Sequence, residues 1–318
     1  MSHTKLTDLS LNDEFEGFYI IKNCGIKTSA NGSSFLACAL VDNSGTMDAK
    51  FWNYSGPVGA GSADEGKPVF VRGKVGEFKG TLQLTLTAVR YAEDRDVYDK
   101  SDLVPVAPID LQIAGKDIRT MVNSIADDDY RRICEAMLDK YGRAFSVWPA
   151  AKSVHHGFVS GLLMHTYNML KLADYLAGQY AEVIDRDLLI AGTLLHDFAK
   201  TQEYACTRLG LISDFTVKGQ LLGHPVMGAQ NVADVARELD VPENKSVLLQ
   251  HMILSHHGEP EFGAAVLPVC AEAELLHWID VIDSRMEIYA ETFKSMDNNT
   301  FSDRIFALEK KIYKHKEQ

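Results

Sequence analysis

Histidine and aspartate residues that could bind divalent metal ions recur along the second half of the sequence. In chain order they are His165, the adjacent pair His196 and Asp197, His224, the adjacent pair His256 and His257, and Asp280. Imidazole and carboxylate groups are the usual ligands of the divalent metals that support hydrolysis. Because these residues are far apart in the sequence, several helices must bring them together. The pattern predicts a metal-dependent phosphoesterase.

Several of these ionisable side chains fall within apolar segments. His165 lies in the middle of an apolar predicted helix, and a histidine satisfied within the core is the alternative for it taken alone. His196 and Asp197 close the apolar run 188–195. Asp280 lies on an otherwise apolar helix face. An unpaired buried charge is costly, and coordination of a metal ion would satisfy all of these groups together.

The order of these residues resembles the H…HD…D motif of the HD-domain metal-dependent phosphohydrolase superfamily. The segment LLHDFAK around the His-Asp pair is close to the frequent family sequence LLHDIGK. The resemblance implies that one metal ion is bound by His165, His196, Asp197 and Asp280. In two-metal members, it further implies that Asp197 bridges the ions and that the second ion is bound by His224, His256 and His257. One ion and two ions both stay open, since His256 and His257 also fit a helix C-terminus.

Other residues near the predicted ligands could contact substrate phosphate. Lys200 follows Asp197 by three residues, and His155 and His156 precede a predicted helix. The alternatives are a helix-end lysine that faces the helix dipole and histidines with a structural role. We expect Asp283 to orient a ligand or to cap a neighbouring element. The residues predicted to act in metal-assisted hydrolysis are Asp197, Lys200 and His196.

The first part of the chain is predicted to form a small β-barrel. Residues 14–92 contain five short runs rich in Val, Ile, Phe, Tyr and Thr, separated by turn signals such as Asn31-Gly32 and Lys79-Gly80. The order of the runs, with the longest gap after the third, resembles an OB-fold, which carries oligonucleotides on its strand 2–3 face. Aromatic rings could stack bases and cations could bind phosphates, although core packing is the alternative for each ring. The residues predicted to bind nucleic acid are Phe35, Lys50, Trp52, Arg72, Lys74 and Lys79.

The remainder of the chain is predicted to be helical, because apolar residues recur at spacings of three and four. A β-hairpin is expected within 206–220, and helices are expected at 225–240, 242–256, 268–294 and 303–316. The predicted fold is thus an N-terminal all-β OB-fold barrel followed by an all-α HD-domain helical bundle. The expected boundaries are 1–92 for the barrel, 93–115 for a charged, proline-containing linker and 116–318 for the bundle.

Composition narrows the class of protein. The five cysteines are odd in number and form no C-x-x-C pair, which fits a reducing cytoplasm. The sequence starts without a signal-peptide pattern and holds no apolar run long enough to span a bilayer, so we expect a cytoplasmic protein without a membrane partner. The net charge of −12 disfavours broad binding to a phosphate backbone, although bound divalent cations would offset part of it.

Taken together, the barrel and the HD motifs resemble the YhaM-type 3′-5′ exoribonucleases over nearly the whole chain. The segments that carry the resemblance include ALVDNSGTMDAKFWN, AAKSVHHGFVSGLLMHT, LGLISDFTVKGQLLGH and ILSHHG. The resemblance implies trimming of single-stranded RNA, or of DNA as well, from the 3′ end to nucleoside monophosphates. It implies Mn²⁺ as the cofactor, while Fe, Co, Ni and Zn suit the same ligands.

Two other functions stay open at this point. The first is an HD-type nucleotide phosphohydrolase or cyclic-dinucleotide phosphodiesterase, against which the full barrel argues, since a small substrate needs no module that holds a strand. The second is a nucleic-acid-binding regulatory protein with a vestigial metal site, against which the intact ligand set argues. A homo-oligomer is also left open, because the sequence does not fix the oligomeric state.

Overall fold

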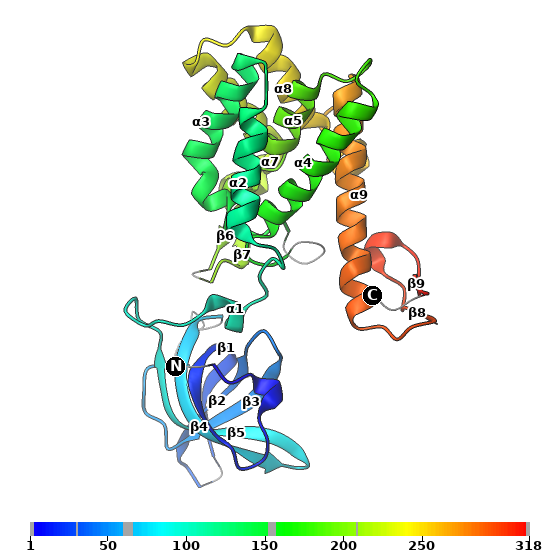
Figure 1. Cartoon of the computed structure of the whole chain (residues 1–318). Helices are drawn as coiled ribbons and strands as arrows, with labels where there is room; N and C mark the ends of the chain where they lie inside the picture. The colour runs from blue at the N-terminus through cyan, green and yellow to red at the C-terminus, as the bar shows by residue number, and fades with distance from the viewer. Residues whose placement is uncertain (1–2, 30, 60–65, 152–156, 208, 316–318) are drawn as a thin grey trace. The chain divides into compact units, whose positions relative to one another are not determined.

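The computed structural model describes residues 3–29, 31–59, 66–151, 157–207 and 209–315. Its contacts divide the chain into two compact units (Figure 1). One unit comprises residues 1–106 with 207–209, and the other comprises 107–206 with 210–318. Within the described ranges, the structure contains no helix with the length and apolarity that crossing a membrane requires.

The first unit is a closed five-stranded barrel. Its strands are β1 (Glu14–Thr28), β2 (Ser34–Val41), β3 (Thr46–Trp52), β4 (Pro68–Phe78) and β5 (Thr81–Tyr91). They close in the order β1-β2-β3-β5-β4, with β3 and β5 parallel and the other pairs antiparallel. A five-stranded Greek-key barrel of this kind is the OB-fold, as the sequence predicted.

The barrel core is filled by inward-facing residues from all five strands, among them Tyr19, Leu36 and Leu84, which are completely buried. A Cβ atom on Gly73 would lie 2.6 Å from the backbone oxygen of Thr85, so only glycine fits on β4 where β5 bulges against it. Packing of these apolar side chains fixes the strands and thereby the positions of the residues that face outward.

Asp42, at the end of β2, connects the N-terminal segment to the barrel. Its buried carboxylate accepts hydrogen bonds from the backbone N–H of Leu6 at 2.8 Å and from Ser44 at 2.8 Å (N–H) and 2.6 Å (hydroxyl). The imidazole Nε2 of His3 lies 3.0 Å from the same carboxylate. The short 3₁₀ helix Leu6–Asp8 is thereby held against the barrel.

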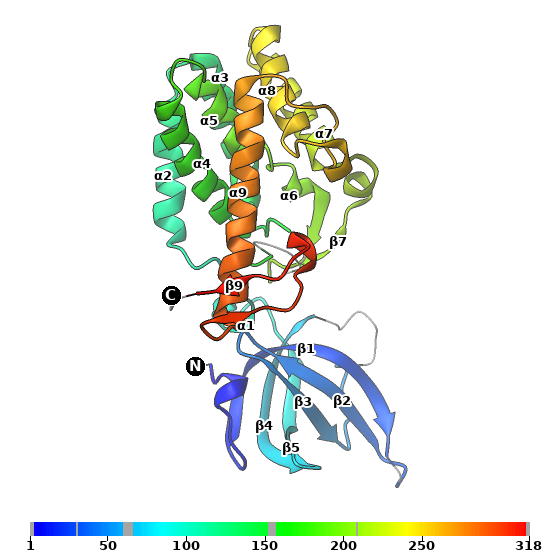
Figure 2. The same ribbon diagram turned by 90° about the vertical axis from the view of Figure 1, so that its right-hand side faces the viewer.

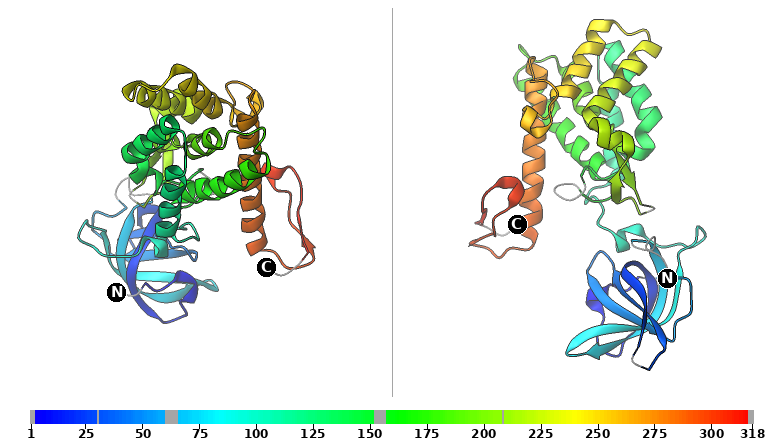
Figure 3. Two further views of the ribbon diagram at one scale, coloured as in Figure 1. Left: turned by 45° about the horizontal axis from the view of Figure 1, so that its top comes forward. Right: turned by 180° about the vertical axis from the view of Figure 1, so that it is seen from behind.

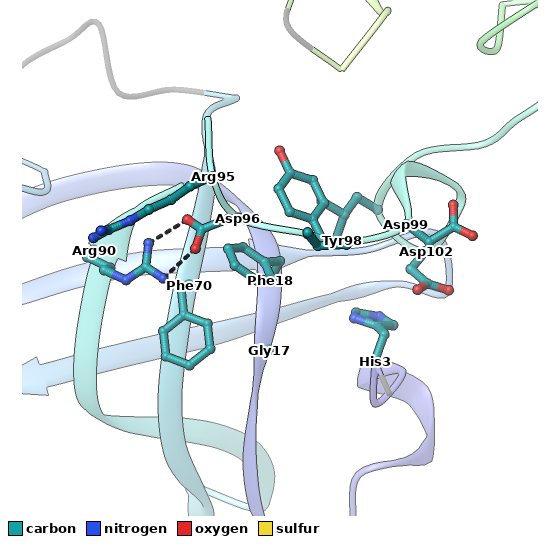
Figure 4. Close-up of a pocket in the computed structure, with 12 residues that line it drawn as sticks. His3, Gly17, Phe18, Phe70, Arg90, Arg95, Asp96, Tyr98, Asp99 and Asp102 are labelled. Atoms are coloured by element: carbon teal, nitrogen blue, oxygen red, sulfur yellow. Dashed lines mark hydrogen bonds and ion pairs between the residues drawn. The ribbon is translucent and has the colours of Figure 1, made fainter. Parts of the chain in front are cut away.

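The segment after β5, within the expected linker 93–115, packs onto the barrel at its start. The guanidinium of Arg90 donates two hydrogen bonds to the carboxylate of Asp96, and the ring of Tyr98 stacks on Phe18 with centroids 4.5 Å apart (Figure 4). The short helix α1 (Lys100–Leu103) follows. Helix α2 begins at Leu111, five residues before the boundary expected from the sequence.

The second unit is a helical bundle (Figure 2). Its longer helices are α2 (Leu111–Asn123), α3 (Asp128–Phe145), α4 (Gly161–Gln179), α5 (Arg186–Leu195), α7 (Val217–Glu238), α8 (Glu243–Ser255) and α9 (Ala271–Lys294). Asp110, Asp127 and Asp185 cap α2, α3 and α5 by accepting hydrogen bonds from first-turn N–H groups. The short helix α6 (Lys200–Glu203) leads into a hairpin of β6 (Tyr204–Cys206) and β7 (Ile212–Phe215), which confirms the predicted hairpin.

The helix predicted at 303–316 is wrong. This segment contains a 3₁₀ turn (Phe306–Leu308) and strand β9 (Tyr313–Lys314), which pairs with β8 (Thr300–Phe301) beside the C-terminal half of α9 (Figures 2 and 3). Leu308 and Ile312 pack on Ile288 of α9. Their spacing of four suits a helix equally well, but here the amine of Lys314 donates to the carbonyls of Phe293 and Met296 and caps α9.

Candidate metal centre

Helix α5 delivers the His-Asp pair to the interior of the bundle. Every residue from Leu188 to Leu195 is buried, so the helix runs through the core, and His196 forms its C-cap. The ring of Phe198 stacks on Phe145 with centroids 4.4 Å apart and fixes the chain just after the pair. Asp197 is therefore only 2% exposed although it carries a carboxylate.

A kink in α7 aims His224 at the same place. Gly223 has a φ of 71°, a conformation that glycine adopts without strain, and helical geometry resumes after it. Pro225 stands in the first turn of the resumed helix, where its missing N–H costs nothing. Gly219 allows a close approach as well, since a Cβ there would lie 2.3 Å from the backbone oxygen of Glu203. The sequence Gly-His-Pro thus places an imidazole at a helix start inside the bundle.

The remaining candidate ligands come from three other helices. His165 lies in α4, and Asp280 lies in α9. His256 is the C-cap of α8, and His257 follows it before Gly258 turns the chain at a φ of 79°. His165 and His256 are each 1% exposed.

The carboxylate of Asp197 lies at the centre of these side chains. Its Oδ2 lies 3.6 Å from Nε2 of His165 and 3.3 Å from Nε2 of His196. Its Oδ1 lies 3.3 Å from Nε2 of His224 and 3.7 Å from Nε2 of His256. Each carboxylate oxygen therefore faces its own set of imidazoles.

The potential ligand atoms fall into two groups, each with all its atoms within 4.8 Å of one another. The inner group comprises His165, His196 and Asp197, and the outer group comprises His224, His256 and His257. Asp280 falls outside these tight groups, but its Oδ1 lies 3.3 Å from Nε2 of His165. The structure thus brings together all seven residues that the sequence proposed as metal ligands.

Buried atoms without hydrogen-bond partners concentrate at this centre. Among the residues that the structure describes, eleven buried side-chain nitrogen or oxygen atoms lack a partner, and five of them belong to these two groups. They are Nε2 of His196, Oδ1 of Asp197, Nε2 of His224, Nε2 of His256 and Nδ1 of His257. Buried polar atoms are normally paired, and a converging set of imidazole and carboxylate atoms fits a divalent cation.

The ring orientations agree with metal coordination. Nδ1 of His196 lies 2.8 Å from the carbonyl oxygen of Thr193, and Nδ1 of His256 lies 2.6 Å from that of Ile253. A carbonyl only accepts, so each Nδ1 carries the proton and donates it. Each Nε2 then presents its lone pair to the centre, as a metal ligand must.

Two further carboxylates orient the other histidines. Asp283 accepts a hydrogen bond from Nδ1 of His165 at 2.7 Å. Glu203, which is 5% exposed, accepts from Nδ1 of His224 at 3.0 Å and from its backbone N–H at 3.0 Å. The sequence pattern pointed to Asp283 but not to Glu203, which carries no motif signal and enters the core only because Gly219 admits its backbone.

The electrostatic environment favours a cation in the inner group. Burial alone would lower the pKa of His165, but the carboxylates of Asp280 and Asp283 outweigh it and raise the pKa to about 10. A bound metal ion would take the place of that proton. In the outer group, burial and the neighbouring His224 lower the pKa of His257 to about 4, and burial lowers that of His256. These rings are therefore neutral near pH 7, the form that binds metals.

Lys200 lies beside the inner group. Its amine donates a hydrogen bond to Oδ2 of Asp197 at 2.7 Å. Burial opposes its charge, but the Asp197 carboxylate outweighs this and raises the pKa of the amine. Lys200 is thus a fixed positive charge next to the candidate ligands. The other two residues predicted to contact phosphate, His155 and His156, lie outside the described residues.

The predicted nucleic-acid residues lie on the outside of the barrel. Trp52 is 45% exposed and packs on the partly buried Phe35 with centroids 4.8 Å apart. The amine of Lys50 lies 5.3 Å from the centroid of Trp52 and 4.7 Å from that of Phe78, which is 52% exposed. The exposed aromatic–lysine cluster, defined here as Trp52, Phe78, Lys50 and Lys79, joins β3 to the β4–β5 turn.

The other two cations occupy neighbouring positions on β4. Lys74 pairs in register with Thr85 of β5, which pairs in turn with Lys50, so the two lysines stand two strands apart at about 10 Å. Arg72 donates to Glu16 at 2.6 and 2.8 Å, which partly neutralises its charge. Tyr54, by contrast, is buried and accepts a hydrogen bond from the backbone N–H of Val58, so it belongs to the barrel core.

Comparison with known proteins agrees with both halves of the structure. The HD domain family matches residues 162–285. A protein from Oceanobacillus iheyensis named 3′-5′ exoribonuclease YhaM is 32% identical over 96% of this chain and 94% of its own length. A protein of the same name from Listeria innocua is 34% identical over 97% of both chains. This chain belongs to the YhaM-type 3′-5′ exoribonuclease family.

Membership of this family makes the chain a hydrolytic enzyme of the HD class. Among solved structures, the second OB-fold domain of replication protein A from Methanococcus maripaludis covers 30% of this chain at 13% identity with a TM-score of 0.22. The family relationship and the ligand chemistry together support a metal-dependent nuclease.

Proposed function

We propose that this enzyme is a metal-dependent 3′-5′ exonuclease that degrades single-stranded RNA from its 3′ end to nucleoside monophosphates. The observation that carries the proposal is the convergence of two ligand groups on the single carboxylate of Asp197. Relatives that match almost the whole chain bear the name 3′-5′ exoribonuclease. We further propose that two ions bind, one in each group, and that Mn²⁺ serves as the ion.

Each part of the centre has a distinct task in this proposal. When bound, the ions supply Lewis-acid stabilisation and an activated water for attack on the phosphodiester. Asp197 presents one oxygen to each ligand group and so fixes the position of one group relative to the other. Lys200 donates to a non-bridging phosphate oxygen and neutralises charge that develops on it. The hydrolysed bond joins phosphorus to the 3′ oxygen of the penultimate nucleotide, so the last nucleotide leaves with its 5′ phosphate.

The exposed aromatic–lysine cluster of the barrel is the proposed contact for the strand. Every base has a flat face, so Trp52 and Phe78 can stack bases of any sequence. Lys50 lies against both rings and can reach the intervening phosphate. The cluster reads no base edge, which suits an enzyme that must shorten any sequence.

The decisive experiment uses purified full-length protein with Mn²⁺ and a 5′-labelled single-stranded RNA of about 20 nucleotides. We expect a ladder of products that shortens one nucleotide at a time, with release of nucleoside 5′-monophosphates. The Asp197→Ala variant, purified in parallel, should give no ladder. Single-stranded DNA, a cyclic dinucleotide and free nucleotides are incubated alongside. Hydrolysis of only the small nucleotides, or RNA binding without cleavage, would contradict the proposal.

A further inference from the structure

A pocket of about 700 Å³ opens directly beside the candidate metal centre. His257 and Asp280, both candidate ligands, form part of its wall. Most of the remaining wall comes from α9 and from the loop that precedes it, including Phe262, Leu267 and Trp278. The volume lies in the range typical of sites for small molecules, and apolar and aromatic groups line it as in such sites.

The aromatic side of this pocket is held in a fixed shape. The indole N–H of Trp278 donates to the carboxylate of Glu274 at 2.8 Å, which orients a ring that is 52% exposed. The neighbouring ring of His277 lies 5.0 Å from Trp278 and donates from Nδ1 to the carbonyl of His256. A Cβ on Gly258 would lie 2.3 Å from that imidazole, so glycine allows the loop to pack on it. The ring of Trp278 is therefore a preformed flat surface, and through His277 it contacts the loop that carries His256 and His257.

The charges in the pocket separate an acidic end near Trp278 from a cationic end at Arg285. Arg285 lies two helical turns beyond Trp278 on the same side of α9, about 10 Å along the helix axis. It is exposed, and no acidic side chain in the described part of the chain forms an ion pair with it. Near Trp278 the carboxylate of Glu274 would repel a phosphate but not a base. The pocket thus offers a stacking surface at one end and a guanidinium at the other.

We propose that this pocket binds the 3′-terminal nucleotide of the substrate, with its base stacked on Trp278 and its phosphate directed to the metal centre and Arg285. This inference rests on the function proposed above and specifies where the terminal nucleotide lies. The released nucleoside 5′-monophosphate occupies the same place as the terminal nucleotide, so it is a competitive inhibitor of RNA degradation. Guanidinium groups pair readily with phosphate oxygens, and Arg285 supplies that contact.

The test measures binding of 5′-AMP and of adenosine to the Mn²⁺-loaded full chain by isothermal titration calorimetry. Trp278→Ala should weaken both ligands by about 5- to 150-fold, the range for the loss of one base–aromatic stack. Trp278→Phe should retain most of the affinity for both. Arg285→Ala should weaken 5′-AMP by about 10-fold or more and leave adenosine unchanged, because adenosine lacks the phosphate. The matched control is Ile282→Ala, an exposed residue of α9 outside the pocket, which should bind both ligands as the wild type does.

The outcomes separate the pocket from the proposed function. If the wild type degrades RNA while Trp278→Ala binds 5′-AMP and adenosine as tightly as the wild type, the pocket assignment is wrong and the function stands. If RNA is not degraded but 5′-AMP binding still depends on Trp278 and Arg285, the exonuclease proposal is wrong and the nucleotide pocket stands. Conversion of 5′-AMP to adenosine and phosphate during the titration would likewise overturn the exonuclease proposal alone.

Discussion

The carboxylates behind the two ligand groups provide a way to perturb each group separately. Asp283 accepts a hydrogen bond from Nδ1 of His165, and Glu203 accepts one from Nδ1 of His224. In Asp283→Asn, the side-chain amide can donate to Nδ1, which moves the ring proton to Nε2 and removes the lone pair that would bind the ion. Glu203→Gln has the same effect on His224. Each substitution preserves shape and removes one charge.

The magnitude follows from the loss of one orienting hydrogen bond and one charge behind each histidine. Replacing such an outer partner lowers metal affinity by about 10- to 100-fold, equivalent to about 1.4 to 2.7 kcal/mol. In Glu203→Gln the remaining side-chain oxygen can still accept the backbone N–H of His224, so we expect the two variants to lose metal affinity by similar amounts. Because His165 and His224 belong to different groups, each variant should weaken one binding event and spare the other.

The assay is calorimetric titration of metal-stripped protein with Mn²⁺, with bound metal counted by elemental analysis. The wild type should bind two ions, and each variant should retain one of the two affinities. Asp303→Asn, an exposed aspartate far along the chain, is the matched control for loss of a carboxylate. If both variants weakened the same single event, or if the wild type bound only one ion, the assignment of one ion to each group would be refuted.

Three further changes test other parts of the structure. Lys200→Ala should lower kcat on RNA by about 10²- to 10³-fold, the usual loss for one charge-stabilising donor, while elemental analysis shows unchanged metal content. Trp52→Ala combined with Phe78→Ala should raise KM for a 20-nucleotide RNA by about 5-fold or more and leave hydrolysis of a dinucleotide unchanged. Asp42→Ala should lower the urea unfolding free energy of the barrel by about 3 kcal/mol, because Asp42 accepts several hydrogen bonds in a buried place.

The Asp42 prediction has a defined pH dependence. Burial raises the pKa of this carboxyl, but hydrogen bonds from Ser44 and Leu6 outweigh it and hold the pKa below its usual value. A group whose pKa is lowered on folding stabilises the protein above its unfolded pKa of about 4 and loses that contribution as the pH falls further. The stability difference between the wild type and Asp42→Ala should therefore shrink below about pH 4. A difference that stayed constant down to pH 2 would contradict this account.

Lys200 and the barrel rings each have a result that would count against the assigned role. If Lys200→Ala lost its metal along with its activity, the lysine would be holding Asp197 in place and not neutralising phosphate. If the Trp52 and Phe78 double variant slowed dinucleotide hydrolysis as much as RNA degradation, the rings would be needed for the fold of the enzyme and not for strand contact.

Much of the metal centre could be predicted from the sequence, because ionisable residues there lie within apolar segments that must be buried. His196 and Asp197 end an apolar run, and a carboxylate in such a position needs a partner. The barrel strands were also predictable, since Gly and Asn mark the turns between short β-branched runs. In both cases the signal lies within a few neighbouring residues.

Features that depend on contacts between distant segments could not be read in this way. Glu203 belongs to no motif, and its role becomes visible only when the chain folds Gly219 against it. The segment 303–316 has apolar residues at helical spacing. In the structure, however, Leu308 and Ile312 pack on α9 from a non-helical segment that is held by an antiparallel β-bridge between Ile305 and Lys310. The spacing of the apolar residues fits both a helix and the observed turns, and packing against α9 selects the observed turns.

The energetics of the centre show why this arrangement favours a bound cation. Five buried atoms of the two groups lack hydrogen-bond partners in the described part of the protein. A buried polar atom without a partner generally costs about 1 to 3 kcal/mol, so a centre that gathers several of them favours a cation that can pair with all of them. Coordination converts this cost into binding free energy, because ions that bind only the folded chain stabilise it. Ions bound by these residues would therefore stabilise the folded chain as well as position the phosphodiester.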